Sequence, residues 1–512
     1  MRILIQILAL LVTLQCVRSD DGENNVNLLR SANCDTFKSC IECTSAKTWT
    51  GSSCRWCPTT SDCHAEGSLS NKCNTEEQIT SKDNCPMGPK DEPEQIHIAL
   101  FGDAGMTISW VTREDTNSSI VVYGTSETQL NMKASGPSAK QLLENWYHHV
   151  SIDNLKQDTT YYYSVGDGDT FSEVYSFRTS PESSSGFVAS IFGDWGYGEN
   201  GNAVVTRNAL DTITKDADFI FHLGDIAYAD DAFLHDITGF EYENIYNSWM
   251  NWIQNISAFK PYMVAVGNHE SECHAPSCIT SKTYRDALHN FSAYNTRWDM
   301  PFEKSASRSN MWYSYNYGLA HFVAINTETD FPKAPEFSHG DSGLLPAGGF
   351  GRDEREYLDW LEADLKAANA SRAERPWIFA GGHRQMYGTG NSIEPNLQNA
   401  VEELFQKYGV DVYFAGHQHS YTRTYPVYQS KVSTSYVRPN ATAYVIVGGA
   451  GCDEMKISDG LTFTASSPWE VYHDGSHYGT GRLTVYNHTH MKWEYILSDD
   501  LSVADSFVLV RE

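Results

Sequence analysis

From residue 187 onward, short apolar runs alternate with amphipathic stretches, and this alternation predicts strands and helices in turn. The helical pattern is clearest at Tyr357, Leu358, Leu361 and Leu365, which share one face of a helix. The expected helices cover 202–215, 242–259, 352–368 and 396–408. The expected strands cover 187–192, 219–223, 262–266, one or two segments within 312–326, 377–380, 410–415, 443–447, 481–486 and 491–496. This strand–helix rhythm predicts a layered α/β domain at 186–512.

Residues 93–180 have a different pattern, in which short alternating strands are separated by Gly, Asp and Ser. The runs at 106–112, 120–123 and 160–165 are examples, and together they predict a β-sandwich. Asp103 lies here after Gly102, with no helical pattern following it. We therefore expect a hairpin turn at Asp103 and no role in metal binding.

Eight of the twelve cysteines fall within residues 34–85. We expect a separate cysteine-rich module at 33–86, which is too short to bury a hydrophobic core without cross-links. The eight cysteines are Cys34, Cys40, Cys43, Cys54, Cys57, Cys63, Cys73 and Cys85. Two Cys-x-x-Cys pairs leave a zinc site open, but an even set in a secreted chain favours four disulfides. The spacing, with Trp56 beside Cys57, resembles the plexin–semaphorin–integrin cysteine-rich module. That resemblance implies a spacer, or a site for a protein partner.

The N-terminus has the three parts of a signal peptide, at residues 1–19. Arg2 is the positive end, an apolar core follows that is too short to span a bilayer, and Ser19 closes the segment. Six Asn-x-Ser/Thr sequons agree with a secretory route, at Asn117, Asn255, Asn290, Asn369, Asn440 and Asn487. We therefore expect a secreted glycoprotein, extracellular or in an acidic vacuole or lysosome-like compartment.

Charge and hydropathy restrict the partners. The formal net charge of −28 argues against nucleic-acid binding and against adhesion to anionic membranes, since both need clustered Lys and Arg. No later apolar stretch reaches the length of a membrane span, so we expect no membrane anchor.

Five of the expected strands end in polar residues that can bind metal, each with a glycine beside it. The five segments are 192–196, 224–228, 267–270, 381–384 and 416–419. Glycine lets backbone and ion approach without a Cβ clash. His417 and His419 are two residues apart, so on an extended segment both would project to one side. One such motif alone is usually a turn or a hydrogen-bonded rim residue, but five in one domain predict a metal site.

These five segments, in this order, resemble those of the metallophosphoesterases. Tyr228, three residues after Asp225, narrows the resemblance to the purple acid phosphatases, as do the segments 377–387, 416–421 and 478–490. The sandwich at 93–180 resembles that family's N-terminal fibronectin-III-like domain. The implied fold is multidomain, with an α/β metallophosphoesterase domain of two sheets flanked by helices.

The resemblance implies two metal ions bridged by Asp225. Fe(III) would be bound by Asp194, Tyr228 and His419, and a divalent Zn, Fe or Mn ion by Asn268, His383 and His417. Hard oxygen ligands suit the trivalent ion. The implied reaction is hydrolysis of phosphate monoesters at acidic pH, by attack of metal-bound hydroxide on phosphorus.

Other residues have implied supporting roles at this site. His269 is the candidate catalytic residue, steadying the phosphate or protonating the leaving group. Glu270 is a candidate for orienting a neighbouring histidine, with a purely structural role as the alternative. Arg384 and Tyr387 are candidates for support of the substrate, because Gly388 to Ser392 lacks the additional histidine of plant-type members. Gln385 stands where Pro is common in the family.

The remaining polar residues near these motifs have structural interpretations. We expect His222 and His274 to be structural and Cys273 and Cys278 to form a loop disulfide. Cys452 is left without an obvious partner and could link two chains. The alternative functions are a phosphodiesterase or nucleotide pyrophosphatase on the same scaffold, against which Tyr228 argues, and a non-catalytic surface or adhesion protein.

Overall fold

The computed structural model describes residues 34, 43–44, 52–57, 62–68, 78–80, 89–198, 203–231, 240–336, 345–389, 393–452 and 467–511. The chain divides into two compact units, Met1–Pro89 and Lys90–Glu512. The expected signal peptide, Cys40, Cys73 and Cys85 lie outside the described residues, as does the segment 390–392.

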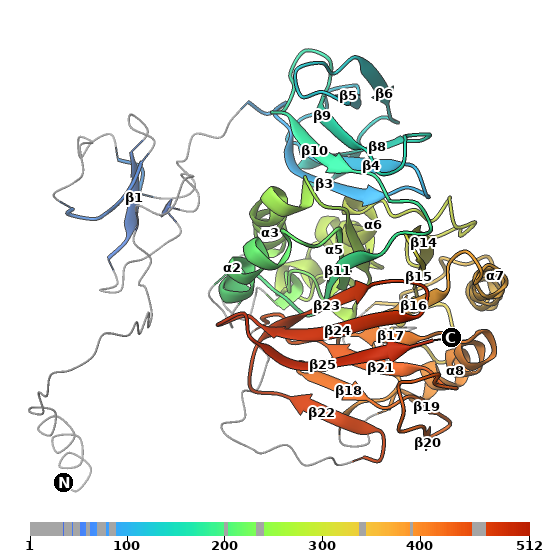
Figure 1. Ribbon diagram of the computed structural model, residues 1–512. Coiled ribbons are helices and arrows are strands. Elements are labelled where there is room, and N and C mark those ends of the chain that lie inside the picture. The colour runs from blue at the N-terminus through green and yellow to red at the C-terminus, as the bar shows by residue number, and fades with distance from the viewer. Residues whose placement is uncertain are drawn as a thin grey trace, which may run out of the picture. The chain divides into compact units, whose positions relative to one another are not determined.

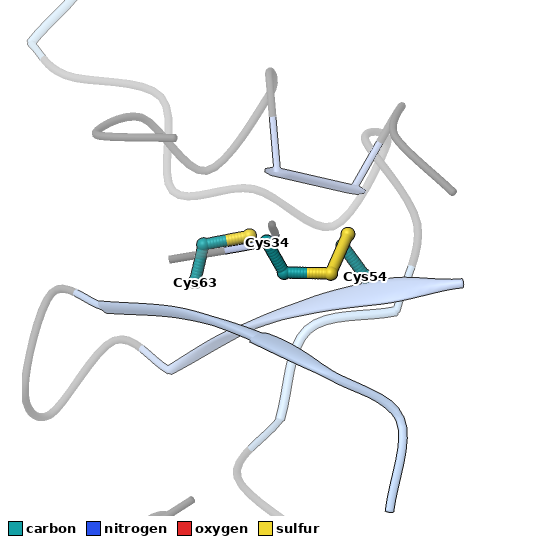
Figure 2. Close-up of side chains that lie close together, drawn as sticks. All are labelled: Cys34, Cys54 and Cys63. Atoms are coloured by element: carbon teal, nitrogen blue, oxygen red, sulfur yellow. A yellow bond between two sulfur atoms is a disulfide. The ribbon is translucent and has the colours of Figure 1, made fainter. Parts of the chain in front are cut away.

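Disulfides hold the described part of the first unit. Strand β1 (Cys54–Cys57) pairs antiparallel with β2 (Asp62–Ala65). Bonds join Cys34 to Cys54 and Cys43 to Cys63, and Cys57 is also disulfide-bonded. Figure 2 shows the sulfur atoms of Cys34, Cys54 and Cys63 close together. Because each of these cysteines is bonded in a disulfide, the disulfide prediction is confirmed over the zinc alternative for them.

The second unit begins with the predicted β-sandwich, made of two four-stranded antiparallel sheets (Figure 1). One has the order β3 (Glu94–Leu100), β4 (Met106–Thr112), β8 (Asn145–Ile152) and β7 (Lys140–Leu142). The other has the order β10 (Tyr175–Arg178), β9 (Thr160–Gly166), β5 (Ile120–Gly124) and β6 (Met132–Ser135). Asp103 lies in the turn between β3 and β4, as predicted, and its carboxylate accepts from Asn316 and Arg375.

The α/β domain contains two further sheets. The first has the order β13 (Tyr262–Ala265), β12 (Phe219–Leu223), β11 (Phe187–Phe192), β23 (Gly479–Val485), β24 (His490–Leu497) and β25 (Val503–Val510). The second has the order β14 (Tyr313–Tyr317), β15 (Ala320–Ala324), β16 (Trp377–Gly381), β17 (Val412–Ala415), β21 (Ala443–Val447), β18 (Tyr421–Thr424) and β22 (Glu470–Asp474). Strands β11–β13 are parallel to one another, as are β15–β17 and β21. The multidomain fold class is confirmed.

Helices cover the outer faces of these sheets, with α2 and α3 on one side and α7 and α8 on the other (Figure 1). Long helices connect the parallel strands: α2 (Ala203–Ile213), α3 (Tyr242–Ser257), α7 (Glu356–Ala370) and α8 (Pro395–Tyr408). Each buries one apolar stripe, such as Tyr357, Leu361 and Leu365 of α7. Shorter elements are η4 (Asn268–Glu270), α4 (Pro276–Thr280), α5 (Lys282–Leu288), α6 (Ser292–Arg297), and the strands β19 (Val427–Tyr428) and β20 (Lys431–Val432).

The sandwich packs directly on the α/β domain through β3 and α3. Tyr163 donates to the carbonyl of Ala258 at 2.7 Å, and Ser257 donates to the carbonyl of Ile96 at 3.0 Å. Apolar residues of both domains form one continuous buried cluster. Buried hydrogen bonds inside apolar packing hold the two domains in a defined arrangement.

The sequence did not predict several elements of the α/β domain. Strands β18, β22 and β25 and helices α4–α6 were missed. β25 is an edge strand and α4–α6 are short, so their periodicity is weak. The predicted Cys273–Cys278 disulfide is confirmed beside α4.

Candidate metal centre

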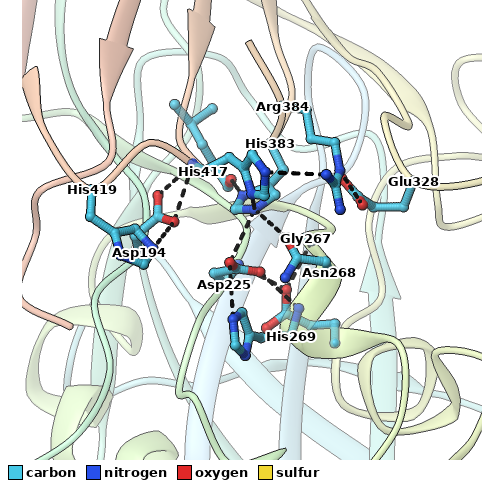
Figure 3. Close-up of polar contacts among 12 residues, drawn as sticks. Asp194, Asp225, Gly267, Asn268, His269, Glu328, His383, Arg384, His417 and His419 are labelled. Atoms are coloured by element: carbon cyan, nitrogen blue, oxygen red, sulfur yellow. Dashed lines mark hydrogen bonds and ion pairs between the residues drawn. The ribbon is translucent and has the colours of Figure 1, made fainter. Parts of the chain in front are cut away.

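Five parallel strands from the two sheets deliver their polar ends to one place. Asp194 follows β11, Asp225 follows β12, Asn268 follows β13, His383 follows β16, and His417 and His419 follow β17. Figure 3 shows these side chains pointing toward one another. Parallel strands bring their carboxyl ends to the same edge of a sheet, which is where ligands bind in open α/β folds.

Two groups of possible metal ligands share Asp225. Asp194, Asp225 and His419 form one, and Asp225, His383 and His417 form the other. Within each group the ligand atoms lie within 4.8 Å of one another. A single carboxylate that belongs to both groups is the arrangement expected of a residue that bridges two ions.

Tyr228 lies against the first group. Its hydroxyl is 2.9 Å from Nε2 of His419, 3.2 Å from Oδ1 of Asp194 and 3.4 Å from Oδ2 of Asp225. The phenol oxygen is thus surrounded by the other three predicted ligands of the trivalent ion.

Asn268 and the two other histidines form the second group. Nε2 of His383 is 3.0 Å from Oδ1 of Asn268, 3.0 Å from Oδ2 of Asp225 and 3.2 Å from Nδ1 of His417. Nδ1 of His383 donates to the carbonyl of Leu223 at 2.9 Å. That hydrogen bond directs the lone pair of Nε2 into the group, which is the usual support of a metal-binding histidine.

The backbone at these positions is strained in a way that places the side chains. Asp194, Asp225, Tyr228 and His417 all have positive φ, between 49° and 65°. Non-glycine residues at positive φ concentrate at functional sites. The prediction of an extended segment at residues 417–419 is wrong, because the chain bends there. The bend sends His417 to the second group and His419 to the first.

Two glycines give the carboxylates the room they need. A Cβ on Gly267 would lie 2.2 Å from Oδ1 of Asp225, and a Cβ on Gly416 would lie 2.3 Å from Oδ2 of Asp194. Any side chain at either position would displace a predicted ligand.

Glu270 supports the backbone rather than a histidine. Its buried carboxylate accepts from the backbone amides of Asp225, Ile226 and Gly267 at 2.8–2.9 Å. Burial and the Asp225 carboxylate raise the pKa of Glu270 to about 8. Of the two interpretations, orientation of a histidine and a structural role, the contacts favour the second, and the structure that Glu270 holds is the turn that carries Asp225.

His269 is held by a carboxylate that sequence reasoning missed. Nδ1 of His269 donates to Asp230, 2.9 Å from Oδ2, and Asp231 lies at 3.5 Å from the same nitrogen. Nε2 of His269 is 3.8 Å from Oδ2 of Asp225, so this nitrogen faces the ligand groups. Burial lowers the pKa of His269, but Asp230 and Asp225 outweigh burial and raise it well above its usual value. Asp230 lies two residues after Tyr228. This closeness to a predicted ligand was the only feature of the sequence that pointed to Asp230.

His274 also contacts Asp230, with Nδ1 3.0 Å from Oδ2. His274, for which we expected a structural role, and His269 thus contact the same carboxylate. His222 contacts the hydroxyl of Tyr262 at 3.0 Å, inside the first sheet. Burial lowers the pKa of His222 to about 3, as in a neutral core histidine.

The two candidates in the segment after His383 differ. Arg384 is buried, donates from Nε to Glu328 at 2.8 Å, and lies with Nη1 3.1 Å from Nε2 of His417. Tyr387 donates to Glu402 and accepts from the amide of Ser430, which is not a contact with either ligand group.

Cys452 is buried, which does not suit a cysteine that links two chains. Its thiol hydrogen-bonds to Tyr228 and His419, beside the first group. The predicted sequon residues lie elsewhere, and five of them are exposed. Asn290 is half-buried and its side chain is bonded to the backbone of Gly348.

Charge in the centre is balanced among the side chains. Burial raises the pKa of Asp225, but His383 and His269 outweigh it and hold that pKa well below the usual range. Burial lowers the pKa of His383, but Asp225 and Asp194 raise it to about 9. Bound cations would replace such protons, because metal ligands must be deprotonated. The donor set of carboxylates, phenol, amide and imidazoles therefore fits a pair of metal ions.

Three family models match consecutive parts of the chain. The purple acid phosphatase N-terminal domain matches residues 93–179, the calcineurin-like phosphoesterase residues 190–421, and the iron/zinc purple acid phosphatase-like C-terminal segment residues 441–506.

Curated relatives match over most of their own length. An acid phosphatase of Aspergillus ficuum is 31% identical, over 76% of this chain and 82% of the relative. Acid phosphatase type 7 of Danio rerio is 33% identical, over 82% and 92%. The solved purple acid phosphatase from yellow lupin (Lupinus luteus) seeds matches with a TM-score of 0.65 at 23% identity, over 82% of this chain and 75% of that chain, and agrees in fold.

Proposed function

Because this chain belongs to the purple acid phosphatase family, we propose that it is an acid phosphatase that hydrolyses phosphate monoesters at acidic pH. The observation that carries this proposal is the carboxylate of Asp225, which belongs to two groups of ligand atoms at once. The hydroxyl of Tyr228 lies against the first group, and this favours a purple acid phosphatase over the other members of the wider phosphoesterase class.

The first group would hold Fe(III) and the second a divalent ion, Zn, Fe or Mn. Asp194, Tyr228 and His419 provide the anionic oxygens that a trivalent ion needs, together with one imidazole. Asn268, His383 and His417 provide neutral donors for the divalent ion. Asp225 lies between the groups and belongs to both.

Two bound ions supply positive charge for the phosphate oxygens and an activated water as the nucleophile. The chain itself supplies proton transfer to the leaving group. His269 presents Nε2 toward the centre while Asp230 holds Nδ1 at 2.9 Å. The Asp230 carboxylate thus fixes the ring and favours its protonated form, as a general acid requires.

The chain enters the secretory route. The charge and apolar pattern of residues 1–19, the disulfides of the cysteine-rich segment and five exposed sequon asparagines support this. None of the helices in the described part of the chain combines the length and apolar character needed to cross a bilayer. The route is tested on protein recovered from the culture medium. Treatment with a glycosidase should increase its electrophoretic mobility, and a variant in which every exposed sequon is changed should show no such increase.

Metal analysis with a visible spectrum tests the enzymatic proposal. We expect one iron and one further metal ion per chain and an absorption band from phenolate-to-iron charge transfer, absent in Tyr228→Phe. A colourless iron-free protein that still cleaves phosphate esters would refute the purple phosphatase assignment and favour a phosphodiesterase or pyrophosphatase. A protein that binds no metal and has no activity would favour a surface or adhesion role.

A further inference from the structure

A cavity of about 470 Å³ lies at the edge of the second sheet opposite the candidate metal centre. It is lined by the ends of α7 and α8, which pack side by side (Figure 1), by residues 438–442 before β21, and by Arg511. Asp411 lines the cavity and precedes β17, whereas His417 follows β17 and belongs to the second group. The volume falls in the range of roughly 300–1,000 Å³ that is usual for small-ligand sites. The cavity therefore has room for a ligand that is separate from the phosphatase site.

Two of the sequon asparagines, Asn369 and Asn440, line this cavity although they are far apart in the chain. Asn369 lies in the last turn of α7, Asn440 lies shortly before β21, and both are exposed. The amide of Asn369 is oriented by the cavity itself, since its Oδ1 accepts from Nε of the lining residue Arg372 at 2.8 Å. An N-linked glycan is attached to the nitrogen of such an amide. The first sugars on either asparagine therefore begin at the wall of the cavity.

The wall of the cavity is rich in hydrogen-bond donors. Four cationic side chains line it, against the single carboxylate of Asp411: they are Arg372, Lys407, Arg438 and Arg511. In a chain whose formal net charge is −28, this is a local reversal of sign. Asp411 is shared, because its carboxylate accepts from both Arg372 and Arg511. Arg and Lys side chains can only donate, whereas the hydroxyl and acetamido oxygens of a sugar accept. The wall thus complements the oxygen-rich surface of a glycan.

We propose that this cavity binds the first sugars of the chain's own N-linked glycans, carried by Asn369 and Asn440. The inference rests on the proposed secretory route and not on the metal centre. A sugar tethered at the wall has an effective concentration on the order of millimolar, so weak contacts are enough to keep it bound. A ligand that binds only the folded state stabilises that state. The docked sugars therefore hold the ends of α7 and α8 and the segment before β21 together as one surface.

The test measures how fast a peptide N-glycosidase releases the glycan from each sequon of the full-length secreted protein. Release converts the asparagine to aspartate, which peptide mass spectrometry detects at each site separately. The rate on native protein is divided by the rate on denatured protein, so that every site is its own reference. We expect native release to be about tenfold slower at Asn369 and Asn440, because a sugar tethered at millimolar concentration is bound most of the time. Asn117 and Asn487 are exposed and lie outside the cavity, so release there should be slowed little.

Variants of the wall separate docking from simple shielding by the backbone. Arg438→Ala removes an exposed cation of the cavity, and Arg511→Ala removes a half-buried one. Each should raise the rate of native release at both cavity sequons toward the rate on denatured protein. Lys366→Ala is the matched control, because it removes an exposed cation of α7 that does not line the cavity, and it should change neither rate. The two wall variants are measured separately, so either is sufficient if the other does not fold.

Three results would overturn the inference while leaving the secretory route intact. One is native release that is as fast at Asn369 and Asn440 as at Asn117. The second is slow release that neither wall variant changes, which would assign the protection to the backbone alone. The third is a protein that carries glycans elsewhere but none at these two asparagines.

Inorganic phosphate is the probe for the competing explanation, an anion site. Fast native release, together with a phosphate-dependent rise in melting temperature that Arg438→Ala abolishes, would replace the glycan by an anion as the occupant of the cavity. A secreted protein without a glycan at any sequon would refute the glycosylation on which the inference rests, and the inference with it. The metal centre would be unaffected by any of these results.

Discussion

Replacement of Asp230 by Asn tests how the chain controls the proton on His269. The Asp230 carboxylate is fully buried and lies 2.9–3.0 Å from Nδ1 of His269. Asparagine keeps the shape but removes the charge that favours the protonated imidazole. A hydrogen bond to a charged partner contributes about 1.5–3 kcal/mol. At about 1.4 kcal/mol per factor of ten, that loss lowers the protonated fraction by roughly 10- to 100-fold above the new pKa.

The assay compares two substrates that differ in how much they need a proton. Alkyl phosphates have poor leaving groups, so their kcat/KM should fall about 10- to 100-fold in Asp230→Asn, in line with the loss of the charged hydrogen bond. A nitrophenyl phosphate leaves without much help, so its kcat/KM should fall far less. The basic limb of the pH–rate profile should also move to lower pH, because a general acid must be protonated and the pKa of His269 is lowered.

Asp231→Asn is the matched control. Asp231 lies 3.5 Å from the same nitrogen and is more exposed than Asp230, with side chains 18% and 0% exposed. Its loss should change both substrates by less than about threefold, as expected for a screened charge. Equal losses for the two leaving groups, or equal effects of the two variants, would show that Asp230 does not act through the proton of His269.

Three further predictions concern the bridging ligand Asp225, the glycine that leaves room for it, and a buried histidine of the β-sandwich. Asp225→Asn should lose both metal ions and nearly all activity, measured by metal analysis on folded protein. Gly267→Ala should lower metal content, because its Cβ would lie 2.2 Å from Oδ1 of Asp225. Gly475→Ala is the control, since its Cβ would meet only the movable ring of His473, at 3.2 Å. His97 is buried and desolvation lowers its pKa from 6.5 to about 4, so the unfolded chain takes up the proton first and stability should fall between pH 6.5 and 4, by up to about 3 kcal/mol. Urea midpoints at several pH values measure how steeply the stability changes with pH. In His97→Gln this dependence should be weaker by the contribution of one proton.

Each of these has a contrary result. Full metal content in Asp225→Asn would mean that the two groups do not share an ion-bridging carboxylate. Equal metal content in the two glycine variants would mean that the carboxylate can move aside at no cost. An unaltered slope in His97→Gln would place the acid sensitivity elsewhere in the molecule.

The sequence alone determined where the ligands come from. Strand ends marked by glycine and a polar residue can be recognised locally, because burial of a strand forces an apolar run and the turn after it forces a glycine. Asp194, Asp225, Asn268, His383, His417 and His419 were all found in this way, and the structure brings them together. The same local logic separated Asp103 from them, since no helix follows its turn.

Only the tertiary structure decided which residues contact and orient the ligands and the catalytic histidine. Asp230 reaches His269 across 39 residues, Arg384 reaches His417 across 33, and Glu270 reaches the amide of Asp225 across 45. Nothing in a local pattern specifies such pairs, because they depend on how two sheets pack and on which face of a turn looks inward. The bend at His417 is of the same kind: the sequence predicted that His417 and His419 bind neighbouring ions from an extended segment, whereas they reach their two groups from a turn with positive φ at His417. Local sequence therefore sets which side chains can bind metal, whereas packing sets their protons and orientation, and through these the chemistry of the site.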